Sequence, residues 1–315
     1  MKEMRKNPLK TVPFITAIAL FGILPRLSYS AEITAYKGVF RPFSDSNGNI
    51  FIAIREFERG TKRLTLTVNP LTFETAVMEE AETLGKGIEI GLDDSPFMKA
   101  LSRYGGPPTG PQDHGLRNAP AEQAVFITVD LCPSRGKLDY ELFRFLEVYS
   151  KGDPAPVAIA ISGGWIKKHA EELKWLINEA KAERLNITWV NHSYSHPYKG
   201  NRPPEEDFLL LDKKNFEKEA LLNEALMLEN GIIPSPFFRF PGLVADRELL
   251  ARLKKLALIP IGSDAWLAKG QMPKQGSVIL VHGNGNEPAG IKALFKYLGD
   301  PVYKTKLLPL QSAIR

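Results

Sequence analysis

The chain has 315 residues, enough for one large domain with an extension, and its formal net charge at pH 7 is +5. Residues 1–30 hold five cations and one anion. Without them Lys and Arg fall from 41 to 36, Asp and Glu fall from 36 to 35, and the net charge is +1. This balance, with no basic stripe in the sequence, argues against a nucleic-acid partner. The single cysteine, Cys132, excludes an internal disulfide and a zinc site built from several thiolates.

The first thirty residues have the pattern of a secretory signal peptide. Four cations stand within Met1–Lys10, an apolar run covers Thr11–Leu24, and the small residues Ser28 and Ser30 precede a cleavage site before Ala31. An uncleaved anchor is the alternative, but a membrane-spanning helix needs about 20 apolar residues and this run is shorter. We therefore expect an exported protein, in the periplasm, the extracellular space or the cell envelope, with no stable membrane span after cleavage.

Residues 31–104 are predicted to form a small β-rich N-terminal module. A turn cluster at 44–49 separates two apolar runs, and Arg63–Val68 alternates as a half-buried strand does, while Thr75–Leu84 suits a short helix. This module contains no catalytic constellation, and we expect it to pack on the main domain rather than to bind carbohydrate separately. Residues 105–122 are rich in Gly and Pro and are interpreted as a linker.

Residues 123–315 alternate between short apolar runs and helical patterns, which is typical of a parallel α/β architecture, either a barrel or a doubly wound sheet. Neither a GxGxxG turn after a strand nor a P-loop is present, so the nucleotide-binding versions of this architecture lose support. The expected strands are 124–129, 157–161, 187–190, 237–240, 258–261 and 278–281, and the expected helices are 139–149, 165–182, 216–229, 246–256 and 289–298.

Polar residues stand at the ends of these apolar runs, where the strands of a β/α barrel bring their side chains to one face. Each is ambiguous alone: Asp130 suits a helix N-cap as well as an active site, and Cys132 suits the core better than a nucleophile or a soft ligand. A spacing of four lets His192 and His196 share one metal ion, although no glutamate makes them an HExxH motif. Arg239 stands among apolar neighbours and needs a carboxylate partner if it is buried. Because several such positions converge, we expect one metal-assisted hydrolytic site.

The order of these motifs resembles that of the polysaccharide deacetylases, the NodB-homology family, over about residues 123–312. The matching residues are Asp130, the pair His192 and His196, Arg239 to Gly242 with Pro241, Asp264 with Trp266, and Leu280 with His282. The resemblance implies an irregular (β/α) barrel, here with a small β-rich N-terminal extension. It also implies removal of acetyl groups from an acetylated polysaccharide or oligosaccharide, with cleavage of a C–N bond or an ester and with a divalent metal, of which Zn is the expected one.

The resemblance also implies a role for each residue. His192 and His196 hold the metal, Asp130 is the general base, Arg239 keeps Asp130 ionised, and His282 is the acid that protonates the leaving amine. Asp264 is expected to hold His282 in its charged form. Trp266, Pro241 and Tyr194 are expected to line the substrate pocket.

The first motif departs from the family pattern. Where the family has Asp-Asp-Gly, this chain has Asp130-Leu131-Cys132, so Leu131 replaces the metal-binding aspartate. The remaining sources of the third ligand are Asp139, Cys132, His114 and solvent, with a weakly bound or absent metal as the other alternative, and we expect Asp139 or solvent. Two other functions stay open: a catalytically inactive protein that binds glycans through the same groove, and an amide or ester hydrolase of a substrate that is not a sugar.

Overall fold

The computed structural model describes residues 32–84, 92–106, 112–120, 122–303 and 305–314. The predicted signal peptide, 1–30, lies outside the described residues, as does part of the predicted linker. Within the described residues, no helix is both long and apolar enough to span a bilayer.

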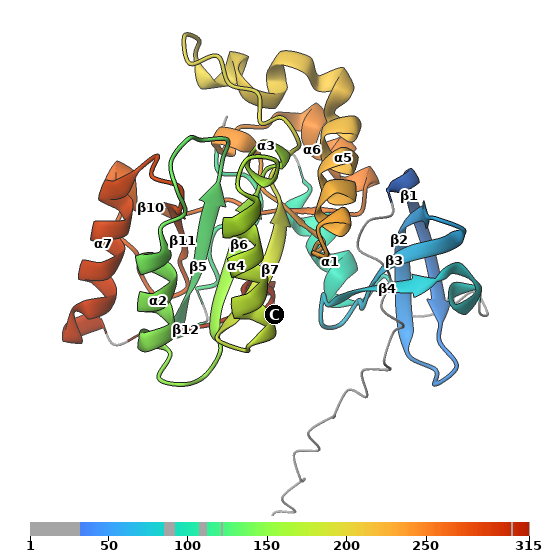
Figure 1. Ribbon diagram of the computed structural model, residues 1–315, viewed down its shortest axis with the longest axis horizontal. Helices are drawn as coiled ribbons and strands as arrows, with labels where there is room; N and C mark the ends of the chain where they lie inside the picture. The colour runs from blue at the N-terminus through green and yellow to red at the C-terminus, as the bar shows by residue number, and fades with distance from the viewer. Residues whose placement is uncertain (1–31, 85–91, 107–111, 121, 304, 315) are drawn as a thin grey trace, which may run out of the picture.

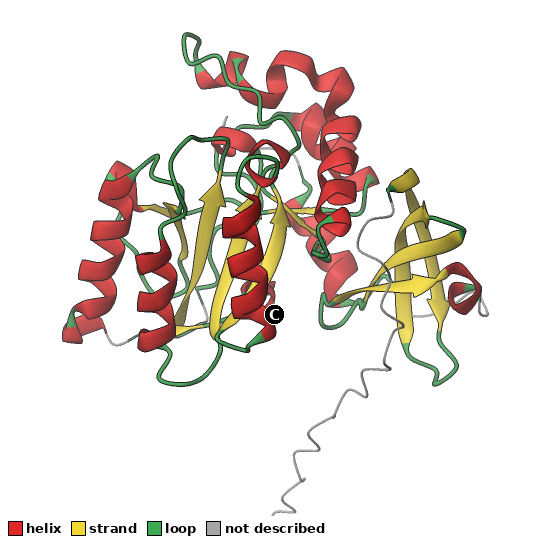
Figure 2. Ribbon diagram, in the orientation of Figure 1, coloured by secondary structure: helices red, strands yellow, loops and turns green. Residues whose placement is uncertain are grey.

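The N-terminal module is a four-stranded antiparallel sheet in which each strand pairs with the next along the chain (Figure 2). The turn between the first two strands is closed by Asp45, whose carboxylate accepts hydrogen bonds from the backbone N–H groups of Asn47 and Asn49 at 2.9 and 2.8 Å. The predicted helix at 75–84 is wrong, because Thr75–Glu79 pairs with the preceding strand and only a 3₁₀ turn follows. The strands are β1 (Ile33–Ser44), β2 (Ile50–Arg59), β3 (Lys62–Val68) and β4 (Thr75–Glu79).

A parallel sheet with helices around it forms the main domain (Figure 1). The strand order is β10-β11-β5-β6-β7-β8-β9, and β12 pairs with β5 outside this path. The predicted α/β class with a β-rich N-terminal extension is confirmed, and the main sheet is an open half-barrel within the described residues. Its strands are β5 (Ala124–Leu131), β6 (Ala155–Ile161), β7 (Leu185–Asn191), β8 (Phe237–Phe238), β9 (Ile259–Pro260), β10 (Ala265–Trp266), β11 (Val278–His282) and β12 (Lys306–Leu307).

The helices follow the strands much as the sequence pattern predicts. One difference is that the helix expected at 165–182 is divided in two, with His169 between the parts. Another is that a helix precedes the linker, where none was predicted. The α-helices are α1 (Pro96–Tyr104), α2 (Tyr140–Tyr149), α3 (Gly163–Ile166), α4 (Ala170–Lys181), α5 (Phe216–Glu229), α6 (Arg247–Lys255) and α7 (Pro288–Gly299). The 3₁₀ segments are 80–83, 204–206, 208–215, 241–243, 267–269, 301–303 and 310–314.

The central strand β5 shows how the sheet positions a site. Its residues at 125, 127, 129 and 131 are buried in the hydrophobic cluster that also contains residues of α2, α4 and α7. Side chains alternate between the two faces of a strand, so 128 and 130 face the other side, where the Thr128 hydroxyl and the Asp130 carboxylate both contact Arg239. Leu131 therefore belongs to the core beneath the helices.

The N-terminal module shares a core with the main domain. One hydrophobic cluster joins Ile52 and Leu66 of the module to Phe126 of β5 and Phe237 of β8. The rings of Phe73 and Phe237 stack across this boundary with centroids 6.0 Å apart. Packing of the module on the main domain, as expected from the sequence, is therefore observed.

Candidate active site

The carboxyl ends of β5, β7 and β11 and the loops after them surround one cavity of about 610 Å³. Parallel strands end at the same edge of a sheet, so residues far apart in the sequence meet there. The cavity is lined by Asp130, Cys132, Pro133, His192, Ser195, His196, Tyr198, Phe208, Gly242, Leu243, Trp266, His282, Asn286 and Glu287.

Asp130 and Arg239 form a buried ion pair at the floor of the site. The Arg239 guanidinium donates to Asp130 Oδ1 at 2.7 Å, to the Thr128 hydroxyl at 2.7 Å and to the Gly262 carbonyl at 2.9 Å. Burial by itself would raise the pKa of Asp130, but Arg239, together with His192 and His282, more than compensates and lowers it. Asp130 is therefore an ionised base whose orientation is fixed, and the expected pairing with Arg239 is present.

The segment His192–His196 is a strained turn held by polar contacts. Ser193 and His196 have backbone φ angles of 63° and 49°, a region that residues other than glycine rarely adopt. The Ser193 N–H donates to Asn191 Oδ1 at 3.0 Å, and the His196 N–H donates to the Ser193 hydroxyl at 3.2 Å. Glu219 of α5 accepts from both the N–H and the hydroxyl of Ser195 at 2.8 Å. These bonds aim both imidazoles into the cavity.

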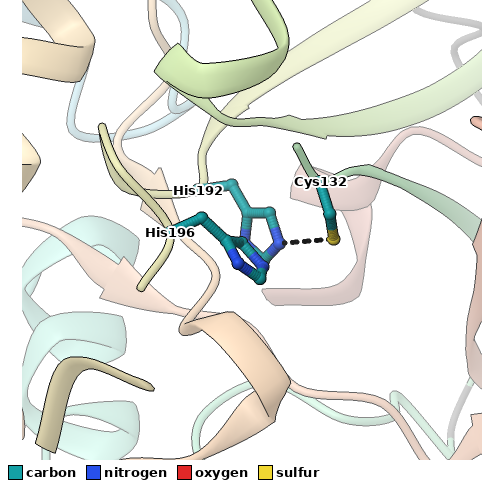
Figure 3. A group of neighbouring side chains, drawn as sticks. All are labelled: Cys132, His192 and His196. Atoms are coloured by element: carbon teal, nitrogen blue, oxygen red, sulfur yellow. Dashed lines mark hydrogen bonds between the residues drawn. The ribbon is translucent and has the colours of Figure 1, made fainter. Parts of the chain in front are cut away.

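Cys132, His192 and His196 bring their sulfur and nitrogen atoms within 4.8 Å of one another (Figure 3). Cys132 Sγ lies 3.5 Å from His192 Nε2. His192 Nδ1 lies 2.9 Å from the Arg239 carbonyl oxygen, which can only accept, so Nδ1 donates there and Nε2 is the ring nitrogen that faces Cys132. Burial opposes ionisation of the thiol, but His196 and His192 reverse its effect and lower the pKa of Cys132 well below its ordinary value.

This donor set fits a divalent metal ion. His196 Nε2 is buried and has no hydrogen-bond partner among the described residues, which is costly unless another group binds it. A thiolate and two imidazoles with a position left for solvent make up a set of ligands that suits zinc, whereas magnesium and calcium prefer oxygen ligands. In the described residues, this is the one group of three or more potential ligands that lies close enough to share an ion.

His282 ends β11 beside Asp130 of β5 and pairs with Glu287. Its Nδ1 lies 2.8 Å from Glu287 Oε2, and the same oxygen accepts from Trp266 Nε1 at 2.7 Å. Burial would lower the pKa of His282, but the nearby Cys132 and Glu287 outweigh it and raise the pKa to about 10. His282 is therefore a protonated imidazole beside the cavity, with the chemistry of a general acid.

Asp264 does not hold His282, contrary to expectation. Its Oδ2 accepts from Asn118 Nδ2 at 3.2 Å and lies 4.0 Å from Lys274 Nζ. Glu287 contacts His282 instead, because the turn after β11 brings it back to the end of that strand. No role was predicted for Glu287 from the sequence, although a carboxylate five residues beyond His282 in a polar turn was a signal for it.

Asp139 does not enter the group of potential ligands. Its carboxylate caps α2 by accepting from the Leu142 N–H at 3.1 Å. Cys132 is the third member of that group instead. The sequence signal for it was its position two residues after Asp130, which places both side chains on the same face of the strand. His114, the other candidate, is buried and its Nε2 lies 3.0 Å from the Ala245 carbonyl oxygen.

The three residues expected to line the pocket differ in position. Trp266 lines the cavity, and Lys269 Nζ lies 3.5 Å from the centroid of its ring. Tyr194 and Pro241 are not among the described lining residues. Tyr194 packs against Gly163 and is covered by Lys167, while Pro241 is buried at the start of a 3₁₀ turn.

No family model matches the chain. Among solved structures it is similar to a family 4 carbohydrate esterase from Bacillus anthracis, with 18% identity, a TM-score of 0.48, and coverage of 73% of this chain and 96% of the other. It is also similar to Bacillus subtilis PdaA, a family 4 carbohydrate esterase, with 16% identity, a TM-score of 0.48, and coverage of 72% and 91%.

A third similar structure is a family 4 pseudoenzyme from Bacillus anthracis, with 14% identity, a TM-score of 0.43, and coverage of 65% and 70%.

Proposed function

We propose that this protein is an exported hydrolase that removes acetyl groups from an acetylated glycan, with a divalent metal held by Cys132, His192 and His196. The observation that carries the proposal is the convergence, in one cavity, of a group that fits a metal, a buried carboxylate paired with arginine, and a protonated histidine. Metal-assisted hydrolysis of an amide or ester uses these three functions: a Lewis acid, a base and an acid.

When bound, the metal would polarise the acetyl carbonyl and lower the pKa of the attacking water. Asp130, held ionised by Arg239, takes the proton from that water. His282, held charged by Glu287, gives its proton to the nitrogen or oxygen of the leaving sugar as the acyl bond breaks. The indole of Trp266 forms an apolar wall beside His282, where the acetyl methyl group fits.

The test is release of acetate from a panel of substrates: N-acetylglucosamine oligomers, acetylated xylan and a non-sugar acetamide. We expect activity on an acetylated glycan, loss with EDTA, and recovery with zinc. Conversion of His192 to alanine should abolish turnover, whereas His169→Asn is the matched control, because His169 is also buried but lies outside the described lining of the cavity.

Three results would contradict the proposal in different ways. Glycan binding without acetate release in the presence of zinc would indicate an inactive binding protein. Release only from the non-sugar acetamide would place the substrate in another class. Full activity of the His192 variant would remove the metal from the mechanism.

Export is part of the proposal and is supported by the signal-like pattern of residues 1–30. N-terminal sequencing of the protein recovered outside the cytoplasm should read from Ala31. A mature chain that still begins near Met1 would contradict cleavage.

A further inference from the structure

Helix α5 lies between the N-terminal module and the turn that carries His192 and His196. The module approaches it from β1, where the Ile33 N–H donates to Glu229 Oε1 at 3.2 Å and the Tyr36 hydroxyl donates to Glu224 Oε2 at 3.1 Å. In Figure 1 the helix stands beside β1 on one side and the main sheet on the other. A helix so placed can transmit the position of one part to the other.

Arg55 of β2 joins the module to this helix through a buried ion pair with Glu224. Its side chain is fully buried, and it binds both oxygens of Glu224, at 2.6 Å from Nε and 3.0 Å from Nη2. Its remaining nitrogen donates to the carbonyls of Ile54 and Leu256 at 2.7 Å each. A planar guanidinium bound in this two-pronged way fixes the carboxylate in both position and orientation.

The same helix holds the turn through a second set of contacts. Asn191 Nδ2 donates to the Ala220 carbonyl at 2.9 Å and to Glu224 Oε1 at 3.4 Å. Asn223 Nδ2 donates to Asn191 Oδ1 at 2.8 Å, and that oxygen also accepts from the Ser193 N–H. A continuous buried network therefore connects Arg55 of the module with the backbone at Ser193.

We propose that Arg55 is a positioning residue for the metal-binding turn, so that the N-terminal module is a working part of the active site. The turn needs support because two of its residues, Ser193 and His196, have strained backbone angles. Glu224 is buried and charged, and without Arg55 it would lose its ionic partner and shift away from Asn191. The consequence for zinc rests on the proposed function, whereas the support of the turn does not.

The experiment uses the secreted protein and the double variant Arg55→Met with Glu224→Gln, which leaves no buried charge unpaired. The matched control is Arg59→Met. Arg59 lies on the same strand and also contacts α5, donating to the Leu228 carbonyl at 2.7 Å, but no described contact joins it to Glu224 or Asn191. Hydrogen–deuterium exchange of the metal-free protein is followed in the peptide covering 191–196, and zinc affinity is measured by competition with a chromophoric chelator.

In the double variant we expect exchange at 191–196 to become at least about tenfold faster, while exchange in β6 is unchanged. We also expect the zinc Kd to rise about tenfold, as it does when groups that orient metal ligands are removed. The control should match the wild type in both measurements. If the double variant does not fold, Arg55→Lys keeps the charge but loses the two-pronged contact, and it should shift both readouts in the same direction.

Unchanged exchange at 191–196 in a folded variant would overturn the inference, as would an equal change in the control. If the wild-type protein binds no zinc but exchange at 191–196 is still faster in the double variant, the result would support the positioning role of Arg55 and contradict the metal in the proposed function. The two failures are thus distinguishable.

Discussion

Replacing Cys132 with alanine tests the metal site most directly. The sulfur is one of three protein donors within 4.8 Å of one another, and Leu131, which stands where the metal-binding aspartate was expected, is fully buried in the core and has no donor atom. The variant should bind zinc more weakly and remain folded, because deleting one sulfur from a small buried residue costs only about 1 kcal/mol of stability.

The size of the loss follows from the number of donors. Structural zinc bound by four protein ligands has an apparent binding free energy of about 10–16 kcal/mol, so each ligand contributes about 2.5–4 kcal/mol. Water can replace the thiolate and recover a part of this, so we expect a loss of about 3 kcal/mol, which is roughly a 100-fold rise in Kd.

The assay is chelator competition at fixed pH, with cobalt substitution as a second readout. Cobalt bound to a thiolate absorbs in the near ultraviolet, and this band should disappear in Cys132→Ala and persist in the His169→Asn control. A zinc Kd within threefold of the wild-type value, with the band unchanged, would refute ligation by Cys132. The third position would then belong to solvent.

Three further predictions follow from the same structure. Leu131→Asp should lower the free energy of unfolding by about 3–5 kcal/mol without tightening zinc binding, because the new carboxylate would point into the core cluster. A gain in zinc affinity, measured by chelator competition, would contradict this orientation. Glu287→Gln should reduce kcat/KM for deacetylation by about 10-fold to 100-fold and leave the zinc Kd unchanged, since Glu287 contacts His282 but lies outside the group of potential ligands. Activity equal to that of the wild type would show that Glu287 is not needed to orient His282. Asp246 caps α6 and binds Lys213, and these contacts lower the pKa of its carboxyl group although burial would raise it. The ionised carboxylate therefore stabilises the protein fully above the unfolded-state pKa of about 3.9, and this contribution is lost as the pH falls through the lower pKa of the folded state. Asp246→Ala should therefore cost about 1 kcal/mol in urea unfolding at pH 7 and less at pH 3, and a difference that does not depend on pH would contradict the charge argument.

Much of the main domain could be predicted, because its strands are short apolar runs and its helices have clear periodicity. The strands at 124–131 and 155–161 and the helix at 216–229 lie where the pattern placed them, within a few residues. The helix predicted at 75–84 is wrong because the local composition suits a helix, whereas pairing with β3 makes the first half of this segment a strand. Tertiary contacts of that kind cannot be read from ten residues.

The candidate site was predictable where strand ends determined it. Asp130, Arg239 and His282 meet because their strands end at one edge of the sheet. Asp264 and Asp139 were placed wrongly for a different reason: both depend on the path of a loop or on a helix start, which sequence order does not fix. The place of Arg55 could not be predicted, because its partner Glu224 is 169 residues away along the chain and neither residue has a motif around it.

The alternation of β5 also limits how this chain can change. Asp130 and Cys132 both reach the cavity because they are two residues apart, while Val129 and Leu131 fill the core. Insertion or deletion of one residue within β5 would exchange the two sets, turning the base and the thiol toward the core and two aliphatic side chains toward the substrate. Point substitutions can adjust this site step by step, but a change of length in this strand would remove both Asp130 and Cys132 from the cavity in a single event.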